Sequence, residues 1–137
     1  MNSFEKTLVI LMRVAGVLLL TAVIPAVMPF AWMKDVHWTQ GMGELPEGAI
    51  MGYLTRSLSA MYAMHGALVF FISLDVRRYQ PVVKFLAVLG VFFGCGMLVL
   101  DVVVGMPPRW IAGEGPFIIV LGGVMFWLAG QVQSAEA

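Results

Sequence analysis

The chain has 137 residues, of which 61% are hydrophobic and only 12% are charged. A soluble domain carries about 25% charged residues, so this chain has too few charges to cover a surface in water. Its net charge is zero and no basic stripe is visible, which argues against nucleic acid as a partner. The one cysteine, Cys95, excludes an internal disulfide bond. Length and composition therefore predict one integral membrane domain, residues 1–137, with the lipid bilayer as its solvent.

Asn2 and Glu5, near the start of the first apolar run, have the spacing of a capping box, which predicts a helix start. A cleaved signal peptide is the alternative for this run, because Lys6 precedes an apolar stretch. However, Arg13 interrupts that stretch, and the run is longer than a usual signal core. We therefore expect a retained first helix.

Four apolar runs have the length of a membrane-spanning helix, which needs about 20 residues to cross about 30 Å of hydrocarbon. They cover residues 6–29, 50–74, 81–104 and 112–130, the last with its start near Trp110 or Gly115. The predicted fold class is all-α, a four-transmembrane-helix antiparallel bundle.

The longest connection lies between the first two runs, and its two halves differ in composition. In the first half, "PFAWMKDVHWTQ", Phe30, Met33 and Val36 or His37 share a helical stripe, which predicts a short helix lying in the membrane interface. The second half, "GMGELPEG", has the glycines and proline of a turn.

The orientation follows from the positive charges that flank the runs, because cytoplasmic loops carry more lysine and arginine. Lys6, Arg13, Arg77, Arg78 and Lys84 fall on one side, whereas Lys34, Arg56 and Arg109 fall on the other. This distribution predicts that both termini are cytoplasmic and that the longest connection is outside.

The second run has two faces when its residues are placed 100° apart around a helix. Small and polar residues form one face, which we expect to pack inside the bundle. They are Ser59, Tyr62, Ala63, Gly66, Phe70 and Ser73. The opposite face is apolar, and we expect it to contact lipid. It contains Leu54, Met61, Met64, Leu68, Phe71 and Ile72. In the third run, Gly90 and Gly94 form a G-x-x-x-G pair, which is typical of a helix contact.

Arg56 and Asp101 are charged residues at a similar predicted depth in the second and third runs. A charge near the middle of a bilayer costs about 2.5–3.5 kcal/mol on insertion scales unless it is paired. We therefore expect Arg56 to pair with Asp101, with Glu114 as a second acceptor. One interpretation is an outward-facing site for an anionic or polar ligand head. The other, which is more common, is a structural ion pair.

Two further groups of polar residues are candidates. Arg13 and Asp75 are predicted to form a structural ion pair, unless Arg13 extends to the lipid headgroups. Tyr62 and His65 lie near the middle of the second run, where a histidine relays protons or, more often, makes one hydrogen bond between helices. His37 in the outer connection is a further candidate binding residue.

No cofactor and no metal site is predicted. The thioether of Met33 and the imidazole of His37 suit Cu(I), but no cysteine pair or repeated methionine motif accompanies them. Paired catalytic carboxylates, a Ser-His-Asp set and a phosphate-binding loop are also absent from the sequence pattern, so no catalytic residue is predicted.

Several strings together resemble a family of small, functionally uncharacterised bacterial membrane proteins with four predicted helices. They are "WMKDVHW", "GMGELP", "YLTRSLSAMYAMHG", "DVRRYQP", "GMPPRW" and "EGP". This resemblance implies the four-helix fold and a bacterial inner membrane, and it implies no activity. The string "LMRVAG" in the first run is similar to the start of DoxX-like proteins, although the long tryptophan-bearing connection departs from their pattern.

Three functions of different classes follow from these observations. The sequence favours a non-catalytic accessory or structural subunit, whose partners are other membrane subunits or further copies of the chain. The second is binding or transport of a small amphiphile or lipid at the outward-facing polar site. The third is a membrane-embedded isomerase that uses His65 and Tyr62, for which an acid–base partner is not apparent.

Overall fold

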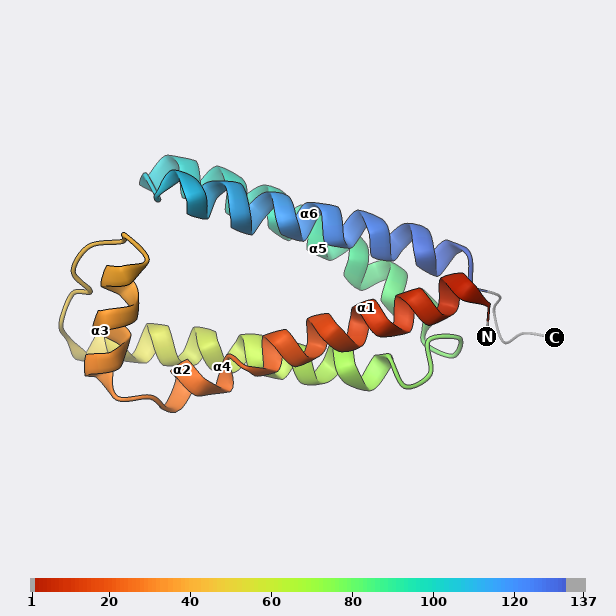
Figure 1. Ribbon diagram of the computed structural model, residues 1–137, viewed down its shortest axis with the longest axis horizontal. Coiled ribbons are helices and arrows are strands. Elements are labelled where there is room, and N and C mark those ends of the chain that lie inside the picture. Colours follow the sequence, from red (N-terminus) through yellow and green to blue (C-terminus); the bar gives the residue numbers. More distant parts are fainter. Residues whose placement is uncertain (1, 133–137) are drawn as a thin grey trace. The chain divides into compact units, whose positions relative to one another are not determined.

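The protein is all-α in the computed structural model, which describes residues 2–132 and contains no strand among them (Figure 1). The helices are α1 (Ser3–Leu20), α2 (Val23–Val27), α3 (Phe30–Thr39), α4 (Ala49–Ile72), α5 (Gln80–Val104) and α6 (Pro108–Gly130). The all-α prediction is thus confirmed. The expected short helix in the longest connection is α3.

The described residues form two compact units. One contains the chain up to Met12 together with everything from Ile72 onward, and the other is Arg13–Phe71. Helix α1 contributes its first part to one unit and its second part to the other. Each unit is described below by itself.

Three helical segments of the described chain are long and apolar enough to cross a membrane, which indicates an integral membrane protein. They are Ser3–Val27, α5 and α6. Helix α4 has 24 residues, which is sufficient length. Its polar side chains, among them Thr55, Arg56 and His65, reduce its apolar character. A fourth span is therefore not confirmed by length and composition.

The first predicted span is interrupted, because α1 ends at Leu20 and α2 begins at Val23. Pro25 explains the break, since proline lacks an N–H group and its ring clashes with the carbonyl four residues earlier, at Thr21. The Thr21 hydroxyl donates to the Leu18 carbonyl at 2.6 Å, and the Ala22 N–H donates to the Leu19 carbonyl at 3.1 Å. These bonds satisfy carbonyls at the end of α1.

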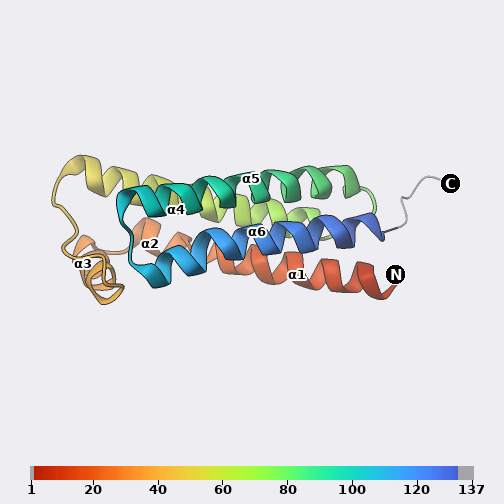
Figure 2. The same ribbon diagram turned by 90° about the horizontal axis from the view of Figure 1, so that it is seen from above.

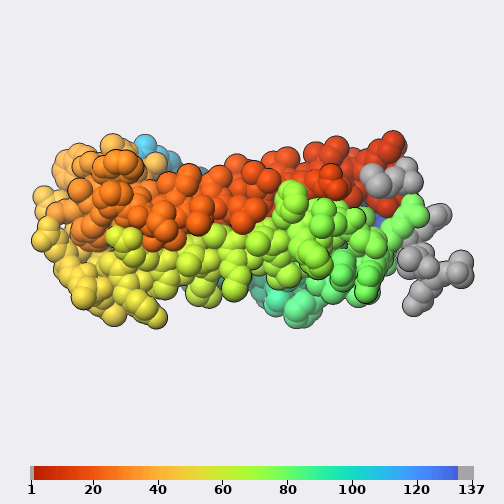
Figure 3. Space-filling model, turned by 90° about the horizontal axis from the view of Figure 1, so that it is seen from below, coloured from red at the N-terminus to blue at the C-terminus, as the bar shows by residue number. Residues whose placement is uncertain are grey.

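In the unit Arg13–Phe71, α1 and α4 touch through their backbones. A Cβ atom at Gly66 would lie 2.7 Å from both the Gly16 carbonyl oxygen and the Leu20 nitrogen, so only glycine fits there. Gly66 is buried, as expected for the small and polar face of α4. Figure 3 shows the orange atoms of α2 and α3 lying directly against the yellow atoms at the start of α4.

The apolar face expected to contact lipid is exposed along most of α4. Met61, Met64 and Phe71 are 61%, 68% and 55% exposed. Ile72 is the exception, because it is only 2% exposed, and its placement on the lipid face was wrong. It is the last residue of α4, where the chain leaves the helix and the 100° pattern stops applying.

In the other unit, α5 and α6 form an antiparallel hairpin (Figure 2). Small residues spaced by seven lie at the contact, with Gly94 against Gly115 and Ala87 against Gly122. A Cβ atom at Gly94 would lie 2.9 Å from the Gly115 carbonyl oxygen, whereas one at Gly90 would meet nothing within 4 Å. Of the two glycines in the G-x-x-x-G pair, only Gly94 therefore lies at the contact with α6.

The same unit is fixed at its other end by polar contacts. The Asn2 side chain caps α1 by accepting the Glu5 N–H at 2.8 Å, which confirms the predicted helix start. The Glu5 carboxylate, only 4% exposed, accepts bidentate hydrogen bonds from Arg77 at 2.8 and 2.9 Å. Gln80 at the start of α5 donates to the carbonyls of Ala129 and Val132, both at 2.7 Å. These contacts connect α1, α5 and the end of α6.

A matched pair of alanine substitutions tests the hairpin. Gly94→Ala places a methyl group against the Gly115 backbone, so we expect a loss of about 1–3 kcal/mol, as is typical of overpacking. Gly90→Ala meets open space and improves helix propensity, so stability is expected to be unchanged or to rise by up to about 1 kcal/mol. Thermal unfolding of both variants in one detergent, followed by circular dichroism, measures the difference. Equal Tm values would show that the contact is absent.

Candidate ligand pocket and carboxyl pair

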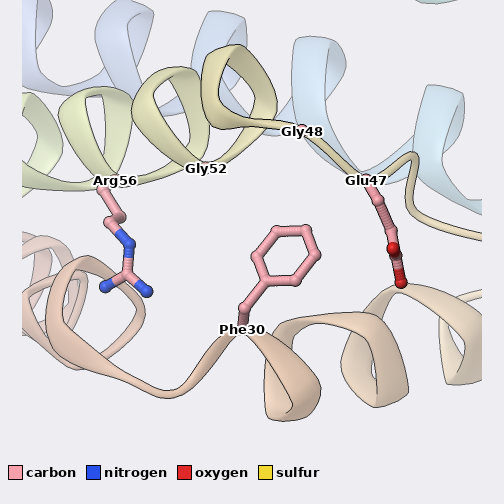
Figure 4. A pocket seen from close by; sticks show the side chains of 5 residues that line it. All are labelled: Phe30, Glu47, Gly48, Gly52 and Arg56. Atoms are coloured by element: carbon pink, nitrogen blue, oxygen red, sulfur yellow. The ribbon is translucent and has the colours of Figure 1, made fainter.

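An open pocket of about 420 Å³ lies within the unit Arg13–Phe71, beneath the connection from α3 to α4. Its lining residues come from the start of α3, the connection and the first two turns of α4. They are Phe30, Glu47, Gly48, Gly52 and Arg56 (Figure 4). Figure 4 shows Arg56 and Glu47 at opposite ends, with the Phe30 ring between them. The pocket thus combines an apolar surface with two charged groups.

Arg56 is the positive charge of the pocket, and a backbone contact holds its guanidinium group. Its Nη1 atom donates to the Ala26 carbonyl of α2 at 3.2 Å. A guanidinium group has five N–H donors in a planar fork, so this bond occupies one of them. The others suit the two oxygens of a carboxylate or phosphate.

Two glycines leave the wall of the pocket free of side chains. Gly48 has φ +144°, a backbone conformation that other residues rarely adopt, and it begins the turn into α4. Gly52 is in the first turns of α4, and a Cβ atom there would meet nothing within 4 Å. The open space that a Gly52 side chain would occupy is therefore part of the pocket.

Glu47, at the far end of the pocket, forms an ion pair with Lys34 of α3. The hydrogen bond and the charge of Lys34 hold the pKa of Glu47 below its ordinary value of 4.5, and they raise the pKa of Lys34 above 10.5. Since Lys34 compensates the charge of Glu47, the net charge at the pocket comes from Arg56.

Helix α3 and its connection are attached to α4 by buried side chains. Met33 is 7% exposed and Leu45 is 6% exposed. The Thr55 hydroxyl donates to the Met33 sulfur at 3.8 Å. His37 lies with Nδ1 2.9 Å from the Gly43 carbonyl oxygen within the connection, and its role as a binding residue stays a prediction. Val36 is exposed and His37 is half-buried. The helical face of α3 that contains Phe30 and Met33 therefore continues to His37 and not to Val36.

A second polar group lies in the α5–α6 hairpin. Asp101 is 3% exposed, and its Oδ2 atom has no hydrogen-bond partner. Glu114 lies on α6 of the same hairpin. Trp110 donates from Nε1 to Glu114 Oε2 at 2.6 Å. Asp101 and Glu114 were both predicted as site residues; both lie in the α5–α6 hairpin, and their role as a site stays a prediction.

The two predicted ion pairs, Arg56–Asp101 and Arg13–Asp75, each join residues of different units, and both stay predictions. Within its own unit, Asp75 accepts the Arg78 N–H at 3.1 Å and so stabilises a turn. Arg13 is exposed on α1.

The proposed isomerase residues differ in exposure. His65 is exposed on α4, whereas Tyr62 is half-buried. No contact between the two supports or contradicts a catalytic role, so that role stays a prediction.

Sequence reasoning missed Glu47 as a pocket residue and Trp110 as a partner of Glu114. The spacing of Trp110 and Glu114 is i, i+4 on a helix, a signal that was available in the sequence. Glu47 offered no such signal, because its ion pair with Lys34 spans an irregular connection.

The chain matches no protein-family model, no curated protein and no solved structure in a comparison with known proteins.

Removing the Lys34–Glu47 ion pair tests how the connection is held. Because the pKa of Glu47 is lowered, the contribution of the pair is present above pH 4.5 and is lost as the pH falls through the lowered pKa. Glu47→Gln mimics the protonated state, so we expect faster amide hydrogen exchange in residues 40–48 at pH 7. Glu44→Gln, in the same connection, is the control and should leave the exchange unchanged. Equal exchange in wild type and Glu47→Gln would contradict this role.

Proposed function

We propose that the protein binds a small anionic amphiphile, such as a lipid with a phosphate or carboxylate headgroup. The observation that carries the proposal is the pocket under the α3–α4 connection with the Arg56 guanidinium at one end. The anionic headgroup is bound by Arg56, and the apolar part of the ligand lies along Phe30.

The charge of the pocket supports an anionic ligand. Lys34 compensates Glu47, whereas the Ala26 carbonyl offers Arg56 only a partial negative charge. A cation at the edge of an apolar region favours an anion that accepts two hydrogen bonds at once. A neutral ligand would leave the remaining donors of Arg56 unsatisfied, which is costly away from water.

The surroundings of the pocket support an amphiphile. Val27 at the end of α2 is 75% exposed, and Ile50 and Tyr53 at the start of α4 are both 67% exposed. In the sequence, Val27 follows Ala26, and Ile50 and Tyr53 lie within two residues of Gly52. They offer a surface along which an acyl chain lies, while the headgroup stays at the guanidinium group.

The proposal includes the membrane arrangement that the sequence predicts. In it, helix α4 is the second span of a four-helix bundle in a bacterial inner membrane, with both termini in the cytoplasm. The pocket then opens to the outer side, near the lipid headgroups. The resemblance to small four-helix bacterial membrane proteins supports this arrangement.

Retention of lipid by Arg56 variants tests the proposal. Wild-type protein in nanodiscs of equal phosphatidylglycerol and phosphatidylcholine is expected to retain phosphatidylglycerol preferentially in native mass spectrometry. Arg56→Gln should reduce that preference by roughly 10–100-fold, since hydrogen bonds to charged groups contribute about 1.5–3 kcal/mol. Arg109→Gln removes the same charge from α6 and should retain the preference.

Filling the pocket provides an independent test. Gly52→Leu places a side chain in the open space in front of Gly52 without displacing a neighbour. We expect it to abolish selective retention while the protein stays folded. Gly123→Leu, at an equally open position on α6, is the matched control. Unchanged retention in both Arg56→Gln and Gly52→Leu would refute the proposal.

A second candidate function, an accessory membrane subunit, is supported by the position of His65. This imidazole is exposed on α4 between Met64 and Leu68, which are 68% and 45% exposed. A polar group that faces lipid without a hydrogen bond is unfavourable. A partner helix that hydrogen-bonds His65 would remove this free-energy penalty.

Photo-crosslinking distinguishes the two candidates. A photoreactive residue placed at His65 should capture a second protein in the native membrane if α4 contacts a subunit. The same residue at Phe85 on α5, 61% exposed, is the control and should capture lipid. Lipid adducts alone at both positions would exclude a subunit on this face of α4.

A further inference from the structure

Binding of an anionic group at Arg56 uses only one end of the pocket. Glu47 lies at the other end, and the Phe30 ring lies between the two charged side chains (Figure 4). Gly48, which follows Glu47, is about two helical turns, or roughly 11 Å, from Arg56 along the direction of α4. A phosphate group bound to Arg56 therefore does not also contact Glu47. A ligand that uses both ends needs a second polar group.

The side of the pocket that joins these two ends consists of backbone. Gly52 lies one turn before Arg56, and Gly48 lies one further turn back, so the three residues follow one line along α4. A Cβ atom at either glycine would meet nothing within 4 Å. An extended polar headgroup can therefore lie along the two glycines, with the Phe30 ring on its other side (Figure 4).

Glu47 can accept further hydrogen bonds although it is paired. The two oxygens of a carboxylate offer about four lone-pair positions. The bond from Lys34 is made to one oxygen, Oε1. The Glu47 side chain is 77% exposed, so its other acceptor positions are accessible from the pocket. Because Lys34 holds the pKa of Glu47 below 4.5, the group is ionised at pH 7 and accepts without donating. The ligand group opposite Glu47 is therefore a donor.

The charge of the ion pair favours a neutral donor over a cationic one. Lys34 already compensates Glu47, and a ligand ammonium at the same carboxylate would be repelled by the Lys34 ammonium. Asp35 and Glu44, which also act on Lys34, do not line the pocket. A hydroxyl group donates one hydrogen bond without this repulsion, whereas a choline group has no N–H or O–H to donate.

We propose that the headgroup of the ligand is a phosphodiester of a polyol such as glycerol, whose phosphate accepts from Arg56 and whose hydroxyl donates to Glu47. This inference rests on the proposed function and adds to it the class of the headgroup. Glu47 is then the residue that determines specificity among anionic lipids, whereas Arg56 selects the anion.

Phosphatidylethanol provides the test, because it has the same single negative charge as phosphatidylglycerol but no headgroup hydroxyl. Wild-type protein in phosphatidylcholine nanodiscs with equal amounts of both lipids and matched acyl chains is analysed by native mass spectrometry. We expect it to retain phosphatidylglycerol about 3–10-fold more than phosphatidylethanol, as one hydrogen bond provides. A parallel sample contains phosphatidylethanolamine in place of phosphatidylethanol and should show the same preference for phosphatidylglycerol.

Two variants separate the acceptor from the ion pair. Glu47→Ala should lose the preference for phosphatidylglycerol over phosphatidylethanol, while both lipids are still retained above phosphatidylcholine because Arg56 is unchanged. Lys34→Ala breaks the same ion pair but keeps the carboxylate, so the preference should be kept. A preference lost in both variants would assign it to the conformation of the connection and overturn the role of Glu47 as acceptor.

The remaining outcomes distinguish this inference from the proposed function. Equal retention of phosphatidylglycerol and phosphatidylethanol, with both above phosphatidylcholine, would overturn the inference and leave the proposed function intact. Preferred retention of phosphatidylethanolamine over phosphatidylglycerol would show an ammonium donor and also overturn it. Retention of neither anionic lipid above phosphatidylcholine would refute the proposed function, and the inference with it.

Discussion

Both units depend on helices that touch backbone to backbone at glycine. In lipid, apolar side chains give little driving force for helix association, so close packing and hydrogen bonds must supply it. Gly66 contacts the backbone of α1 at Gly16, and Gly94 contacts the backbone of α6 at Gly115. A larger residue at these places would separate the helices and change which side chains meet.

The charged residues of the described chain are stabilised in different ways, and the difference distinguishes structural charges from candidate sites. Glu5 and Arg77 form a bidentate ion pair, and Glu5 raises the pKa of Arg77 further. Lys34 and Glu47 compensate each other. Arg56 and Asp101 differ, because Arg56 donates to a backbone carbonyl and Asp101 Oδ2 has no partner. Unsatisfied charges in an apolar environment are functional candidates, because they are costly to keep without a ligand.

The sequence predicted those helices that are set by a long apolar run or by apolar residues at helical spacing. Apolar runs identified the long helices, and the spacing of Phe30 and Met33 identified α3. The first predicted run is found as the candidate span Ser3–Val27, which Pro25 divides into α1 and α2. The prediction was wrong for Ile72, which is buried at the end of α4 and not exposed to lipid. The fourth span stays a prediction, since the polar residues of α4 oppose its length.

In the pocket, Arg56 was predictable from the sequence and its partner was not. Arg56 was identified because a charge in an apolar run is expensive. The binding roles of Asp101 and Glu114 stay predictions. The contact between Arg56 and Ala26 spans 30 residues and involves a backbone atom, so no side-chain pattern reports it. The ion pair of Glu47 depends on how an irregular connection folds.

The end of helix α2 explains how Arg56 is held without being neutralised. The last carbonyls of a helix have no partner within the helix, and together they carry about half a negative charge. Because α2 ends at Val27, the Ala26 carbonyl is one of these groups, and Arg56 satisfies it. A carboxylate in its place would cancel the positive charge and weaken binding of an anion. A carbonyl instead orients the guanidinium group without cancelling its charge, so the end of α2 at Val27 is compatible with the proposed binding of an anionic headgroup.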